Sequence, residues 1–144
     1  MPQQQQPQWQ PITMLQTITR YIDGMLQEAE GQQDNLRQAQ RKPWVLDDYT
    51  VKRVIEVFTV QKNDLWLFDT QLERWQAGTL TDRQRKEVER LTGQMHKLHA
   101  AIADILAMVA ELSKGTIEKQ MLKSDEQLGL EYLMSMFDGE EKQR

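Results

Sequence analysis

Cysteine is absent from this chain of 144 residues. Its absence excludes disulfide frameworks, thiolate nucleophiles and every zinc or iron–sulfur site built on cysteine ligands. Serine is scarce, and Ser113, Ser124 and Ser135 do not stand in the strand, turn and helix context of a nucleophilic serine. A glycine-rich phosphate loop is missing too, since no Gly-Lys-Ser/Thr follows a strand. We therefore expect no enzymatic activity, no cofactor, no metal and no small-molecule substrate.

Long hydrophobic runs and an excess of positive charge are also lacking. No stretch approaches the roughly 18 consecutive apolar residues that span a bilayer. The start, MPQQQQPQWQPITML, has neither the basic residues nor the apolar core of a secretory signal, so we expect a cytoplasmic protein without membrane contact. The net charge of −4 disfavours duplex nucleic acid as a partner, because phosphate binding requires a basic face.

Three segments repeat apolar residues in steps of three and four, which is the spacing of one face of an amphipathic helix. The first runs from Ile12 to about Gln40 and ends before Lys42, whose position ahead of a proline disfavours helical backbone. The second ends at Gly78, and the third ends at Gly115. The third has the clearest pattern: Val88, Leu91, Met95, Leu98, Ile102, Ile105, Val109 and Leu112.

Capping residues mark where the second and third helices begin. Asp47 can accept hydrogen bonds from the first free N–H groups of the second helix. Thr81 and Gln84 have the types and spacing of a capping box at the start of the third helix. Residues 49–60 are rich in β-branched side chains and could be interpreted as a strand, but the apolar heptads that continue to Trp75 favour a helix.

Three helices of about 30 residues with short connections predict an all-α protein, an antiparallel up-down-up bundle with coiled-coil-like packing. One or two short C-terminal helices follow, the last with a cap at Ser124 and an end near Phe137. We expect a disordered Gln/Pro-rich lead at 1–10, the bundle at 11–114, a helical docking segment at 115–137 and a disordered tail at 138–144. Trp9 is either an incidental aromatic in the lead or a packing or partner contact.

Both histidines, His96 and His99, lie three positions apart in the third helix. The pattern that places Met95 and Leu98 in the core puts His96 on the outer face and His99 beside the core edge. A zinc site requires three or four protein ligands, and the nearby carboxylate on the same face is Glu89. We interpret both histidines as surface residues. A helical bundle that binds a metal or a cofactor through His96 and His99 is the alternative function.

The charged side chains are expected to form solvated faces. Asp69 and Asp104 have strongly apolar neighbours in the sequence, and we place both at the surface. The third helix carries a basic stripe: Arg83, Lys86, Arg90 and Lys97. Acidic residues interleave with this stripe, which favours a solvated face. A second alternative uses the stripe to contact nucleic acid as a small helical subunit of a ribonucleoprotein assembly.

Apolar side chains exceed what three helices can bury. The second helix is apolar on more than one side around residues 65–68, and the C-terminal helix has two apolar stripes. The C-terminal helix either folds back onto the second helix as a fourth element or enters a groove of another subunit or partner. The residues that we expect to bind a partner are Trp66, Trp75, Leu130, Tyr132, Met134 and Phe137.

The sequence as a whole predicts a non-enzymatic helical interaction protein. We expect a structural or adaptor subunit that self-associates or docks in a larger protein assembly. A few aromatic and methionine side chains would dominate its affinity, while the surrounding charges would set its orientation.

Overall fold

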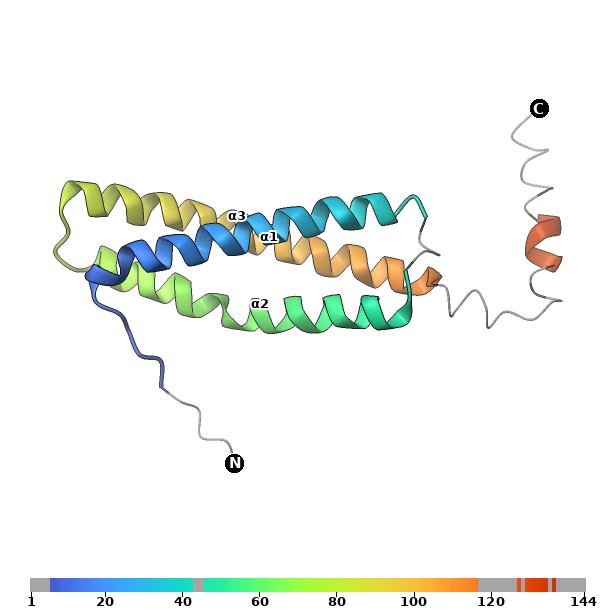
Figure 1. Ribbon diagram of the computed structural model, residues 1–144, viewed down its shortest axis with the longest axis horizontal. Coiled ribbons are helices and arrows are strands. Elements are labelled where there is room, and N and C mark those ends of the chain that lie inside the picture. Colours follow the sequence, from blue (N-terminus) through green and yellow to red (C-terminus); the bar gives the residue numbers. More distant parts are fainter. Residues whose placement is uncertain (1–5, 43–45, 117–126, 128, 135, 137–144) are drawn as a thin grey trace.

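The structure is a computed structural model that describes residues 6–42, 46–116, 127, 129–134 and 136. A 3-10 turn, η1 (Ile12–Met14), leads into α1 (Leu15–Ala39); α2 (Asp48–Gln76) and α3 (Asp82–Leu112) follow, and a second 3-10 turn, η3 (Ser113–Gly115), ends the bundle. Figure 1 shows α2 running back along α1 and α3 running back along α2. The predicted all-α bundle is confirmed, and no residue of the described ranges forms a strand.

The caps that the sequence indicates are present in the structure. The side chain of Asp47 accepts a hydrogen bond from the backbone N–H of Thr50 at 2.7 Å. At the start of α3, the Thr81 hydroxyl accepts from the backbone N–H of Gln84 at 3.2 Å, and the Gln84 side chain accepts from the N–H of Thr81 at 2.9 Å. These contacts satisfy backbone donors that the helix cannot pair internally. The predicted start of both helices is therefore confirmed.

The third helix is the centre of the bundle. All eight apolar residues of its predicted stripe are buried, from Val88 to Leu112. The first and second helices both pack against α3 and approach each other much less closely. Side chains still join these two helices: the ring of Tyr21 from α1 stacks on the ring of Phe68 from α2, with the centroids 6.0 Å apart. Each outer helix therefore depends on α3 to bury its apolar face.

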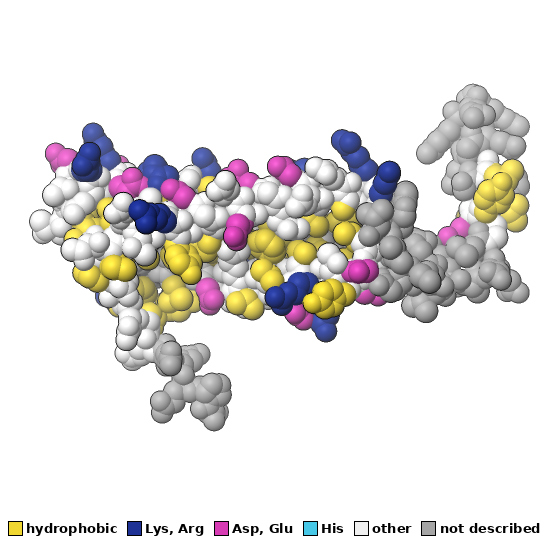
Figure 2. Space-filling model, viewed as in Figure 1, with side chains coloured by type: hydrophobic (Ala, Val, Ile, Leu, Met, Phe, Trp, Pro, Cys, Tyr) yellow, Lys and Arg dark blue, Asp and Glu magenta, His cyan; other side chains and the backbone are white. Residues whose placement is uncertain are grey.

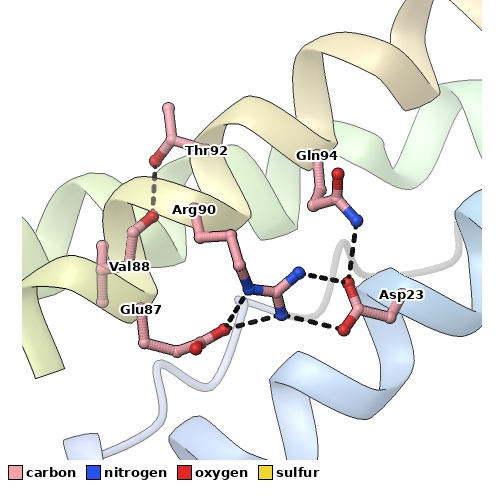
Figure 3. Close-up of polar contacts among 6 residues, drawn as sticks. All are labelled: Asp23, Glu87, Val88, Arg90, Thr92 and Gln94. Carbon is pink, nitrogen blue, oxygen red and sulfur yellow. Dashed lines mark hydrogen bonds and ion pairs between the residues drawn. The ribbon is translucent and has the colours of Figure 1, made fainter. Parts of the chain in front are cut away.

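A polar cluster joins α1 to α3 (Figure 3). Arg90 donates from both terminal nitrogens to the carboxylate of Asp23, at 3.1 and 2.8 Å, and from Nε to Glu87 at 2.8 Å. Gln94 donates a further hydrogen bond to Asp23 at 3.1 Å. The Arg90 contact holds the pKa of Asp23 below its ordinary value, and Asp23 in turn raises the pKa of Arg90. One member of the predicted solvated basic stripe thus lies in a contact between helices.

The opposite end of the bundle is also tied together. Thr116, which follows η3, is fully buried, and its hydroxyl lies 2.5 Å from the carboxylate of Asp48. Midway along the bundle, Gln33 of α1 donates to Asp104 of α3 at 2.8 Å. Asp104 is partly exposed, close to the surface position expected for it. Because Thr116 contacts Asp48, the chain leaves the bundle beside the first turn of α2.

Candidate functional site

The N-terminal segment lies on the second helix. The backbone N–H of Gln10 donates to the side-chain oxygen of Gln71 at 2.6 Å, and the Gln71 amide donates back to the Gln10 carbonyl at 3.2 Å. The same carbonyl accepts from the indole N–H of Trp75 at 2.9 Å. Gln71 is buried, and pairing of both ends of its amide offsets the cost of removing them from water.

Trp9 extends this contact across the outer side of α2. Its ring meets the ring of Trp66 edge-on, with centroids 6.4 Å apart and planes at 76°. The guanidinium of Arg74 lies over the Trp9 ring, 4.5 Å from the ring centroid. Trp9 is therefore a packing contact, the second of the two interpretations open from the sequence. Of the lead expected to be disordered, residues 9 and 10 are placed on α2, whereas 1–5 are outside the described residues.

The two tryptophans proposed as partner contacts have different surroundings. Trp75 is 6% exposed and belongs to the core, with its indole N–H already satisfied by Gln10, so its ring does not reach the surface. Trp66 remains 51% exposed although Trp9 packs against it. Trp66 can therefore contact a partner while the N-terminal segment stays in place.

The remaining outer face of α2 is uncovered and partly apolar. Tyr49 is 75% exposed, Val60 is 61% exposed, and Val57 is exposed to a lesser degree. Arg53 and Asp64 are exposed on the same side of the helix, as their spacing requires. Figure 2 shows apolar side chains alternating with charged ones along the lower edge of the bundle, where α2 runs in Figure 1. Sequence reasoning singled out residues 65–68 and missed this more N-terminal surface.

The described residues of the C-terminal segment are exposed as well. Residues 129–134 are helical, and Leu130, Tyr132, Leu133 and Met134 are each more than half exposed, while Met136 is half exposed. Figure 1 draws the short helix away from the bundle. Phe137, the last residue expected to bind a partner, and the proposed cap Ser124 lie outside the described residues.

The histidines line a groove between α2 and α3. Its volume is about 730 Å³, and Asp69, Glu73, Glu89, His96 and His99 lie on its walls. His99 Nε2 is 2.7 Å from Asp69 Oδ2, so the two residues link α3 to α2. Both histidines are exposed, as the sequence indicates. Among the residues described, no group of three histidine, aspartate or glutamate side chains could hold a metal ion. The contact between His99 and Asp69 therefore joins two helices and does not form part of a metal site among these residues.

Comparisons of the chain with protein-family models, with curated proteins and with solved structures find no match. No helix in the described part of the chain combines the length and the hydropathy required to cross a bilayer. The exposed apolar side chains lie on α2 and on residues 129–134 and 136.

Proposed function

We propose that this chain is a non-enzymatic helical interaction protein, a structural or adaptor subunit that self-associates or docks in a larger protein assembly. One observation supports this proposal above the others: large apolar side chains are exposed on two separate elements, the outer face of α2 and the helix at 129–134. Large exposed apolar side chains that share one face of a helix are typical of contacts with another protein.

Burial of these side chains would supply the free energy of association. Apolar surface removed from water stabilises a complex by roughly 25 cal/mol per Å². Trp66, Tyr132 and Met134 combine large area with either rigidity or adaptability, which is typical of residues that dominate an interface. Charged residues beside the apolar side chains would select the orientation of the partner. Among them are Lys52 and Glu56 of α2, whose Nζ and Oε1 atoms are 3.9 Å apart.

The same proposal places the protein in the cytoplasm. The complete lack of cysteine is compatible with a reducing compartment, where disulfides would not contribute to stability. The partner would be either a second copy of this chain or another protein.

The proposal is tested by measuring the mass of the full chain in solution over a wide concentration range and after native co-purification. We expect the wild-type chain to self-associate or to carry a partner. Replacing Leu130 and Met134 with Asp should reduce association through the tail while leaving the helix content by circular dichroism unchanged.

The matched control is Thr17→Asp with Gln27→Asp, which adds the same charges to exposed positions of α1. This control should behave like the wild type. A chain that sediments as a monomer at every concentration and co-purifies with no partner contradicts the proposed function.

A further inference from the structure

A second stripe of residues runs along α2, distinct from the stripe that faces the core. Its positions advance in steps of three and four, so they share one face of the helix. Its members are Tyr49, Arg53, Val57, Val60, Asp64 and Leu67. All are exposed except Leu67, which is partly buried. These six residues form the outer stripe of α2.

The outer stripe is bounded by the N-terminal segment. The next two positions on the same face, Gln71 and Arg74, are taken up by Gln10 and Trp9. From Tyr49 to Leu67 the stripe spans about 27 Å at 1.5 Å per residue. Its two charged members, Arg53 and Asp64, form no ion pair within the described part of the chain. The stripe therefore presents apolar area and two unpaired charges of opposite sign.

Apolar and charged residues follow one another in the same order from either end of the outer stripe, and only the sign of the charge differs. Large apolar residues, Tyr49 and Leu67, stand at the ends, and Val57 and Val60 stand at the centre. Arg53 precedes the valines by four positions, and Asp64 follows them by four. A two-fold axis between Val57 and Val60 would therefore bring each charge opposite its complement in an antiparallel copy.

We propose that the outer stripe pairs antiparallel with the outer stripe of a second copy of this chain. Arg53 of each copy then faces Asp64 of the other, Val57 packs against Val60, and Tyr49 meets Leu67. Apolar layers of this mixed kind are the pattern of antiparallel coiled coils, which have the same step of three and four residues. A parallel pairing is disfavoured because it sets Arg53 against Arg53 and Asp64 against Asp64.

This inference rests on the proposed function and names a second copy as the partner of the α2 surface. Two single helices in contact over about 27 Å form a small interface, which predicts a weak dimer that depends on concentration. The N-terminal segment lies beyond the end of the paired region, so it can remain on Gln71 and Trp75 when the dimer forms.

Charge reversal at the two positions tests the pairing. Arg53→Asp places two acidic pairs in the interface, and Asp64→Arg places two basic pairs there. Each variant alone should weaken the dimer by about tenfold or more, as measured by sedimentation equilibrium at low salt. The Lys62→Asp variant is the matched control, since it makes the same change of charge on α2 outside the outer stripe.

Mixing the two variants is the decisive measurement. Only the mixed dimer restores both opposite-charge pairs, so the mixture should associate about as tightly as the wild type. The double variant Arg53→Asp with Asp64→Arg should also recover self-association, because it exchanges the partners within each pair. Circular dichroism confirms that every variant retains its helices.

Two results would overturn the pairing. One is a wild-type dimer that survives both single reversals, which leaves the proposed function intact and shifts the contact to another surface such as the tail helix. The other is a wild-type chain that is monomeric alone but co-purifies with a different protein, which again supports docking and excludes self-pairing. A monomer that carries no partner contradicts the inference and the proposed function together.

Discussion

Arg90 of α3 binds both carboxylate oxygens of Asp23 of α1, across 67 positions of sequence. Gln94 donates to the same carboxylate, so the acid has three hydrogen bonds in the folded state. The contact fixes the register of α1 on α3, because a shift of one helical turn would separate all three donors from Asp23.

Folding stability should depend on the protonation of Asp23. Its pKa is lowered in the folded state by the hydrogen bonds from Arg90, so its contribution is present above the unfolded value of about 3.9. The contribution is lost as the pH falls through the folded-state pKa below that value. The pair is partly exposed, and we expect Asp23→Asn to cost about 1 kcal/mol at neutral pH and nothing measurable in strong acid.

The measurement for this pair is urea unfolding of both proteins across the acidic range. Asp34→Asn is the control, because Asp34 pairs with Arg37 in an exposed contact within one helix. That variant should differ little from the wild type at any pH. A constant difference between Asp23→Asn and the wild type down to strong acid would contradict the assigned role of the carboxylate.

Removal of the Gln71 amide should release the N-terminal segment. Gln71→Leu keeps the size of the side chain but removes both hydrogen bonds to the Gln10 backbone. We expect a loss of about 1–2 kcal/mol in unfolding free energy and faster proteolysis ahead of Pro11. The control is Gln27→Leu, a similar change at an exposed position of α1. Equal proteolysis of the two variants would show that the amide does not hold the segment.

Two glycines within helices should lower stability relative to alanine. Apart from the neighbouring backbone of their own helix, Gly31 in α1 and Gly93 in α3 have no atom within 4 Å of the place that a Cβ would occupy. Alanine there should raise the unfolding free energy by about 0.5–1 kcal/mol each, because it restricts the unfolded chain without a clash. Gly78→Ala, located after the end of α2, meets only ordinary contacts at 3.5 and 3.8 Å and should give a smaller gain, because the position is not inside a helix. Thermal unfolding of the three variants checks the difference.

The core of α3 should be the most sensitive part of the bundle. Leu98 is fully buried among residues of the apolar cluster, and Leu98→Ala should cost about 2–5 kcal/mol through lost burial and the cavity left behind. Leu106→Ala removes the same atoms from a partly buried position on the same helix and should cost less. Equal losses in chemical denaturation would contradict the larger contribution that the deeper burial of Leu98 predicts.

The sequence predicts those parts of the fold that local rules determine. The caps at Asp47 and Thr81 follow from residue type and spacing within four positions, and both are confirmed. The buried stripe of α3 follows from a period of about 3.6 residues that is kept from Val88 to Leu112, about seven turns, and it is confirmed throughout. In each case the partner groups lie close together along the chain.

Contacts between distant segments were not predictable in this way. Gln10 and Gln71 are 61 positions apart, and no periodicity reports that a side-chain amide will pair with a particular backbone group. Trp75 illustrates the consequence, since its place in the apolar stripe indicated the core while its size suggested a partner contact. Its satisfied indole N–H, which explains its burial, depends on the position of the N-terminal segment.

The central place of α3 has a consequence for synthesis on the ribosome. The helices α1 and α2 emerge first, and the surface of α3 against which both are buried is translated after them. Until Leu112 has left the exit tunnel, α1 and α2 hold apolar faces with no permanent cover, a state that is prone to aggregation. We therefore expect the nascent chain to expose apolar surface that chaperones can bind until α3 has emerged.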